Sequence, residues 1–230
     1  MMVLAGKLFK LEERVPLELI AEKLKDWRME RVEEYGEQEL KLMSEVKELD
    51  FRRDLLWGIY SEDKVIPTTY RGELRYNLFT RESGFFFTER EGTTLLFVVE
   101  KWRIANNIAS KLGEIIVPRP GAVIEAKISH ETLKELHESN PEATKVIYFD
   151  QVDLPNINKL ALYGNALQDT TLYHEYLKHG KIWYVVFEDK KYGLVVGLTR
   201  NCVVTIFSKI DEETFINYVL ERILPLIEKE

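Results

Sequence analysis

The sequence predicts an α+β fold of two tandem duplicated units, related by a pseudo-two-fold axis. Each unit is expected to run strand, helix, three or four antiparallel strands, and a second helix. Three observations predict this fold. One segment recurs within the chain, helical and strand patterns follow the same order in both halves, and the length of 230 residues suits two domains of about 110.

The recurring segments are 54–79 and 160–187, which share apolar and glycine positions at a nearly constant offset. The offset grows only from 106 to 109 residues, so few insertions separate the two copies. The matched pieces are Leu56-Trp57-Gly58 with Leu162-Tyr163-Gly164, Arg71 to Phe79 with His179 to Phe187, and Ser83 to Thr88 with Tyr192 to Gly197. Such a repeat predicts one supersecondary unit built twice.

The first unit is expected to cover residues 1–115. A strand pattern at 3–11 precedes Pro16, which suits the first turn of a helix, and apolar residues at three- and four-residue steps predict that helix over 16–33. Residues 39–100 have the pattern of strands separated by turns, and a closing helix is expected over 102–112. Pro118 and Pro120 predict a stiff linker over 116–121.

The second unit is expected to cover residues 122–230 in the same order. A strand over 122–129 leads to a helix over 130–138, capped by Ser129, which stops before Asn140-Pro141. Strands are expected within 144–207, and Asp211 caps the last helix. This order resembles each half of the TATA-binding-protein fold, in topology only, and a likeness of topology implies no function.

Composition and charge narrow the function classes. The net charge of −7 disfavours general electrostatic binding to nucleic acid. Cys202 is the single cysteine, which excludes an internal disulfide and a multi-cysteine zinc site. No apolar run is long enough to span a bilayer and no signal peptide is evident, so we expect a cytoplasmic protein without membrane contact. Abundant Glu and Lys are typical of thermophile surfaces. No phosphate-binding loop or nucleophile motif predicts a cofactor, a metal or a catalytic residue.

Several strands carry apolar residues at consecutive positions, which predicts a sheet buried on both faces. Its second face is then covered by the other unit, by a second copy or by a foreign partner, because large exposed apolar patches are rare on monomers. We therefore expect a non-catalytic binding or scaffold protein, acting with a protein partner or as a homodimer. The expected partner-binding residues are Trp183, Val185, Phe187, Phe85, Phe86 and Phe87.

Two alternatives stay open. Ten basic residues against eight acidic ones between Arg52 and Lys111 favour a nucleic-acid-associated protein, whose contacts would be Arg71, Arg75, Arg81, Lys101 and Arg103. An enzyme would centre on His174 and His179, which flank the one local cluster of ring nitrogens and carboxylates. His130 and His137 lie seven residues apart on one expected helix, too far apart to bind one metal ion together, and are expected to be solvated.

Overall fold

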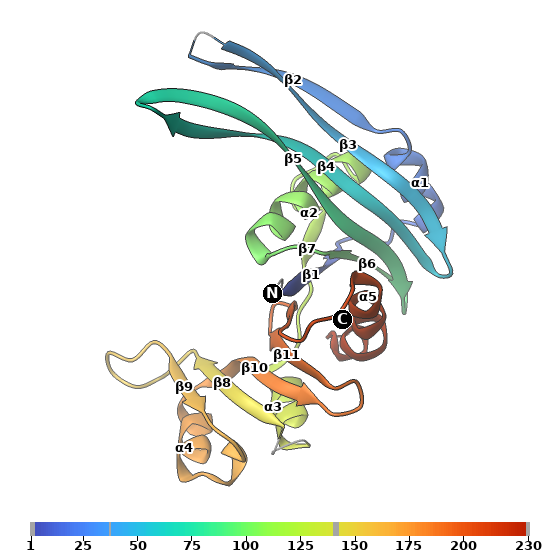
Figure 1. The fold of residues 1–230 in the computed structure, drawn as a ribbon. Helices are drawn as coiled ribbons and strands as arrows, with labels where there is room; N and C mark the ends of the chain where they lie inside the picture. Colours follow the sequence, from blue (N-terminus) through green and yellow to red (C-terminus); the bar gives the residue numbers. More distant parts are fainter. Residues whose placement is uncertain (1–2, 37, 140–142, 229–230) are drawn as a thin grey trace. The chain divides into compact units, whose positions relative to one another are not determined.

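The computed structural model describes residues 3–36, 38–139 and 143–228, and Figure 1 shows their helices and strands. By its contacts the chain divides into two compact units. One contains residues 9–124, and the other contains residues 1–8 together with 125–230. We name them the 9–124 unit and the 125–230 unit.

The first half of the chain is mostly strand. Its elements in order are β1 (Leu4–Leu11), α1 (Leu17–Leu24), β2 (Arg28–Tyr35), β3 (Gln38–Arg52), β4 (Leu55–Tyr70), β5 (Glu73–Arg90), β6 (Thr93–Val98) and α2 (Trp102–Ile116). The expected strand at 3–11, the strands within 39–100 and the helix at 102–112 are therefore confirmed. Three of these strands are long, and β5 alone contains 18 residues.

The second half has shorter strands and more helix. Its elements are β7 (Val123–Glu125), α3 (His130–Glu138), β8 (Thr144–Asp150), β9 (Leu160–Tyr163), α4 (Thr171–His179), β10 (Lys181–Asp189), β11 (Leu194–Thr199), β12 (Val203–Ile206) and α5 (Glu212–Tyr218). The helix of α5 continues through a wider π turn at Val219–Ile223 and a tighter turn at Leu224–Leu226.

The predicted fold class is wrong. The twelve strands form one hydrogen-bonded sheet. Its strand order is β2-β3-β4-β5-β6-β1-β12-β11-β10-β8-β9, and β7 pairs with β1. The neighbouring strands whose registers are determined run antiparallel. Five strands, not three or four, separate α1 from α2, and α4 interrupts the strands of the second half. The chain is a large antiparallel sheet with few helices, and it does not repeat the unit found in the TATA-binding-protein fold.

The two recurring segments adopt different structures, which also overturns the duplication. Residues 54–79 form a continuous β-hairpin of β4 and β5, whereas 160–187 contain β9, α4 and the start of β10. The matched glycines differ as well: Gly72 has φ +84° in a tight turn, but Gly180 has φ −151°, which is extended. The apolar and glycine matches between the two segments therefore do not reflect a shared structure, and the duplication predicted from them is wrong.

The helix expected over 16–33 is also wrong, because α1 ends at Leu24 and the chain turns into β2. Asp26 has φ +54°, a left-handed conformation that Asp tolerates better than most residues and that breaks a helix. Residues 28–35 then pair with β3 in unbroken register, from Arg28 opposite Glu45 to Tyr35 opposite Gln38. This strand pairing overrides the helix propensity of a Glu-rich segment.

The predicted helix caps of the second half are confirmed. Ser129 Oγ accepts a hydrogen bond from the Thr132 backbone N–H at 2.8 Å, and Asp211 Oδ1 accepts one from Thr214 N–H at 2.7 Å. The strand expected over 122–129 is shorter, since β7 covers only Val123–Glu125. The Asn140-Pro141 stop lies outside the described residues.

The 9–124 unit packs α1 and α2 against one face of its sheet (Figure 1). Tyr60 of β4 stacks on Trp27 with ring centroids 6.3 Å apart, and Phe85 meets Phe87 edge-on at 5.8 Å. Gly58 makes room for this packing, because a Cβ atom there would lie 2.6 Å from Phe85 Cζ. The buried apolar side chains of this face come from β1, β3, β4, β5, β6 and both helices.

The 125–230 unit buries polar groups as well as apolar ones. Asp189, at the end of β10, accepts hydrogen bonds from Tyr218 Oη at 3.1 Å, from Arg222 Nε at 3.0 Å and from the Lys191 backbone N–H at 3.1 Å. Burial first, and then the Asp189 carboxylate, raises the pKa of Tyr218. These donors stabilise a carboxylate that would otherwise be costly to bury.

Among the described residues, no helix has both the length and the apolar character needed to cross a bilayer.

Candidate functional site: an exposed hairpin arm

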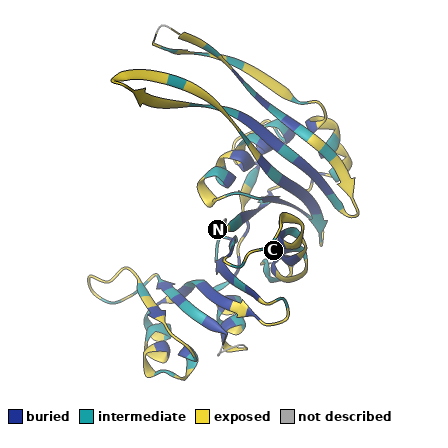
Figure 2. Cartoon of the chain, in the orientation of Figure 1, coloured by how far each residue is buried: buried dark blue, intermediate teal, exposed yellow. Residues whose placement is uncertain are grey.

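The outer part of the β4–β5 hairpin contains the longest run of exposed residues in the part of the chain that the structure describes. We call residues 63–82 the arm. Between Ile66 and Thr80 every residue is exposed except Tyr76. Figure 2 shows this part of the hairpin as a nearly continuous run of exposed residues, while the inner halves of β4 and β5 are buried.

Local sequence explains why the arm is a regular hairpin. Tyr70 lies opposite Glu73, so Arg71-Gly72 forms a two-residue turn, and both turn residues have positive φ, +50° and +84°. A turn of this handedness matches the twist of the flanking strands. The pairing then continues without a register shift from Tyr70–Glu73 to Leu55–Thr88. The arm is therefore a regular extension of the sheet.

Asp63 marks the point where the arm leaves the rest of the sheet. Pairing between β3 and β4 reaches Ser44 opposite Glu62 at this end of the two strands. Beyond it, the Asp63 carboxylate accepts hydrogen bonds from the Met43 backbone N–H at 2.9 Å and from Thr80 Oγ1 at 2.7 Å. A side chain thus replaces the backbone ladder, and β4 and β5 continue as a two-stranded ribbon (Figure 1).

Glu62 joins the base of the arm to α2. Its carboxylate forms ion pairs with Lys111 of α2 and with Lys64 of β4, the latter at 2.8 Å, and its side chain is buried. Burial acts to raise the pKa of Glu62, but the two lysines outweigh it and lower the pKa. The carboxylate is therefore charged, and the base of the arm is fixed to the helix.

The arm is apolar on both faces. Residues directly opposite each other in an antiparallel pair point to the same side, and successive residues alternate. Leu74 and Leu78 therefore share one face, while Ile66, Tyr70 and Phe79 share the other. These five side chains are between 45% and 58% exposed. The alternation of β5 places Leu74 and Leu78 on one side, and both side chains are exposed there.

The two edges of the arm differ. Pro67 lies on β4 and has no N–H to donate, and Tyr76 of β5 contacts Tyr35 of β2 with ring centroids 5.1 Å apart. The β4 edge is thus blunted by a proline and lies toward the β2–β3 hairpin. On the β5 edge, β6 pairs only with Phe85–Arg90, so residues 73–82 have no strand partner there among the residues that the structure describes.

The basic residues proposed for nucleic acid do not form one patch. The guanidinium groups of Arg71 and Arg75 both lie over the Tyr70 ring, at 5.4 Å and 5.0 Å from its centroid. Arg81 lies six residues further along β5, which is about 20 Å in an extended strand. Lys101 and Arg103 lie at the start of α2, where Arg103 stacks on Trp102. The structure brings together only the first two.

The residues predicted to bind a partner are mostly core residues. Val185, Phe187 and the three phenylalanines Phe85 to Phe87 are all buried within the chain. Trp183 is half-buried at a β-bulge, because the β8–β10 register shifts between Ile182 and Tyr184. Its ring lies in an aromatic cluster with Tyr148 and Tyr184, with the Lys159 ammonium 4.7 Å from its centroid. By contrast, five large apolar side chains of the arm are exposed.

The four histidines occupy three kinds of environment. His174 is exposed on α4, and His179 Nδ1 lies 2.8 Å from Asp153 Oδ1. His130 Nδ1 accepts a hydrogen bond from the Ile182 backbone N–H at 2.8 Å, and His137 is buried, so the expectation that both are solvated is wrong. Within the described ranges, no three His, Cys, Asp or Glu residues gather as metal ligands would.

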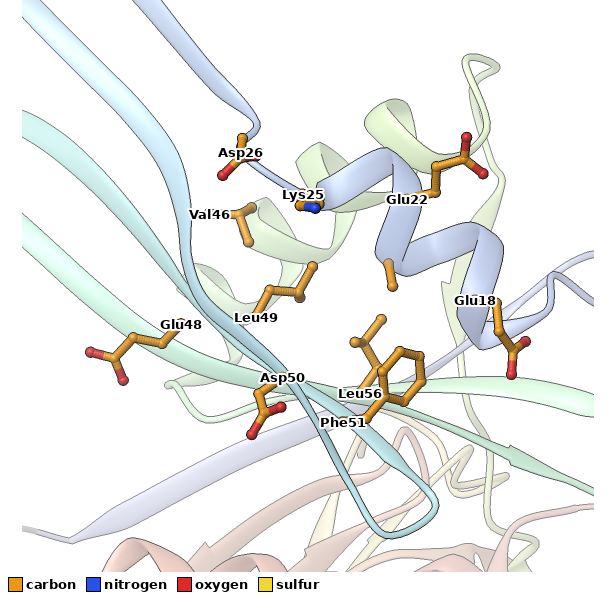
Figure 3. Close-up of a pocket in the computed structure, with 11 residues that line it drawn as sticks. Glu18, Glu22, Lys25, Asp26, Val46, Glu48, Leu49, Asp50, Phe51 and Leu56 are labelled. Carbon is orange, nitrogen blue, oxygen red and sulfur yellow. The ribbon is translucent and has the colours of Figure 1, made fainter.

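A cavity of about 530 Å³ lies between α1 and β3 in the 9–124 unit (Figure 3). Its lining combines apolar and acidic side chains with one lysine, namely Glu18, Ala21, Glu22, Lys25, Asp26, Val46, Glu48, Leu49, Asp50, Phe51 and Leu56. Figure 3 shows Leu49, Leu56 and Phe51 within the hollow, whereas Glu48 and Asp50 point away from it. Polar groups that converge on a ligand are typical of small-molecule sites, and these carboxylates do not converge.

Sequence reasoning missed the arm although a signal was present. The stretch 64–80 combines an Arg-Gly turn with unusually long flanking strands, and Pro67 within a strand pattern indicates an edge. Only the structure shows that both faces of this hairpin are exposed.

Compared with known proteins, the chain matches no family model and no curated protein.

Proposed function

We propose that this protein is a non-catalytic binding protein whose binding surface is the arm, and that its partner is a protein. One observation carries the proposal: five large apolar side chains are about half exposed on a single regular hairpin. Water contact with so much apolar surface is unfavourable, and apolar side chains gathered on an exposed element are typical of interaction sites.

The chemistry of the arm favours a protein partner. An exposed strand edge offers unpaired backbone N–H and C=O groups, and added strands use such edges for affinity while side-chain pockets give specificity. Two guanidinium groups already lie over the Tyr70 ring, which leaves the ring less available for stacking on a base. Association with nucleic acid and a cytoplasmic location stay predictions from the sequence.

A photo-crosslinking amino acid placed at Leu78 tests the proposal in an extract of the native host. We expect adducts between the arm and protein, including the protein itself, because a bound partner must cover this side chain. The matched control is the same amino acid at Leu172 of α4, which is similarly exposed but lies outside the arm. Excess unlabelled wild-type chain should compete with adduct formation.

Equal adduct yields at Leu78 and Leu172, or adducts that excess wild-type chain does not reduce, would contradict the proposal. Either result would show that the arm is exposed without binding anything selectively.

A further inference from the structure

We propose that the arm binds a second copy of this chain, by antiparallel pairing of the two β5 edges around a two-fold axis. The inference rests on the proposed function, and it names the partner. Its basis is the free β5 edge at residues 73–82, together with the order of charged and apolar residues along that edge.

Symmetry restricts how two identical strands can pair. A two-fold axis between antiparallel β5 strands must be perpendicular to the sheet, so opposite residues point to the same side. The numbers of two opposite residues then have a constant, even sum. Each allowed register is therefore centred on one residue of β5, and a few registers can be compared directly.

The register centred on Asn77 is complementary in charge. Glu73 then lies opposite Arg81 of the second copy, and the symmetry forms this pair twice. Arg75, which forms an ion pair with Glu73 of its own chain at 3.1 Å, lies opposite the uncharged Phe79. In the same register Tyr76 lies opposite Leu78, and Leu74 opposite Thr80, which joins the apolar stripes of the two arms on their other face.

The neighbouring registers are disfavoured. A register centred on Leu78 places Arg75 opposite Arg81, and like charges directly opposite each other destabilise a strand pair. One centred on Tyr76 places Glu73 opposite Phe79 and Arg81 beside the Arg71-Gly72 turn, so the pairing of Glu73 with Arg81 is lost. The sequence of this edge thus favours the register centred on Asn77 over the register on each side of it.

The other edge explains why pairing stops at two copies. Pro67 blunts β4, so a second strand does not add there, and a two-fold contact uses the same surface on both chains. The result is a closed dimer with a four-stranded ribbon of β4, β5 and their counterparts, which removes the free β5 edge from solvent.

A charge exchange tests the register. Glu73→Arg alone and Arg81→Glu alone each place like charges opposite each other twice, so we expect the dimer dissociation constant to rise about ten-fold or more. The double variant restores opposite charges, and its dissociation constant should return to within about three-fold of the wild type. Sedimentation equilibrium measures all four proteins, and thermal unfolding checks that each variant is folded.

A cysteine at the symmetry axis tests the geometry. Asn77→Cys places two thiols directly opposite each other, so mild oxidation should give a disulfide-linked dimer. Thr68→Cys is the matched control, since each variant loses the same 2.7 Å hydrogen bond between Asn77 Nδ2 and Thr68 Oγ1. The two Thr68 positions lie about 14 Å apart across the ribbon, three strand spacings, and are also offset by four residues along it, about 13 Å, so they should not cross-link. Cys202 is buried in both variants.

A monomeric wild type at high concentration, equal cross-linking of the two cysteine variants, or a double variant as weak as the single ones would overturn the pairing of two copies. The proposed function would survive such a result if photo-crosslinking at Leu78 gave competed adducts with another protein. Absence of competed adducts of any kind would remove the proposed function itself.

Discussion

His137 lies inside the 125–230 unit, packed edge-on against the Tyr173 ring with centroids 4.8 Å apart. It is 1% exposed, and neither of its ring nitrogens has a hydrogen-bond partner among the described residues. Burial lowers the pKa of His137 to about 4 and outweighs the opposing effect of Glu138. The imidazole is therefore neutral in the folded protein at neutral pH.

This burial predicts a loss of stability in weak acid. The pKa of histidine in an unfolded chain is near 6.5, so between pH 6.5 and 4 the unfolded state binds more protons than the folded state. Stability is complete above pH 6.5 and falls as the pH approaches 4, by up to about 3 kcal/mol. His137→Phe should remove this part of the pH dependence, as measured by urea unfolding at pH 7 and pH 4.5.

His174→Phe provides the control, because the same exchange at an exposed histidine should leave the pH dependence as in the wild type. If the free energy of unfolding falls equally between the two pH values in wild type and His137→Phe, the folded pKa of His137 is not depressed.

At the scale of elements, the arm adds exposed residues to the sheet and few residues to the hydrophobic core. Its residues from Ile66 to Thr80 are almost all exposed, whereas the helices pack on the inner halves of β4 and β5. Removal of the arm should therefore cost the monomer little, apart from the Tyr35–Tyr76 contact.

Deletion of residues 66–77, with Val65 joined to Leu78 through Asn-Gly, tests this view. Val65 lies opposite Leu78, so a two-residue turn closes the shortened hairpin. We expect the free energy of unfolding to change by less than about 1 kcal/mol at the lowest measurable concentration. At high concentration the wild type should gain stability that the shortened protein lacks, because association stabilises the folded state by mass action. A collapse of near-UV circular dichroism in the shortened protein would show that the arm belongs to the core.

Elements were predictable from the sequence where local signals were strong. The Ser129 and Asp211 caps, the apolar face of α2 and the strand at 4–11 each follow from short-range patterns. The helix expected over 16–33 failed because residues 28–35 are committed to β3 by pairing, which no local pattern reveals. The candidate surface failed for a related reason. Alternation in β5 tells which side chains share a face, but not whether anything covers that face.

At the scale of the whole molecule, the predicted duplication was the main error. The prediction of a two-unit fold depended on apolar and glycine matches at a nearly constant offset. The matched segments are a hairpin in one half and strand, helix and strand in the other. The order of the twelve strands depends on pairing between segments that are distant in sequence, such as β1 and β12. Local sequence patterns do not show which distant strands pair. The expected domain bounds, residues 1–115 for the first unit and 122–230 for the second, stay a prediction from the sequence.

The solution mass of the full chain, compared with that of the arm-shortened protein, tests the account most directly. Sedimentation equilibrium should give the wild type twice the 27.1 kDa of one chain, and the shortened protein the mass of a single chain. The same number of chains in both proteins, whether one or two, would contradict the claim that the arm joins two copies.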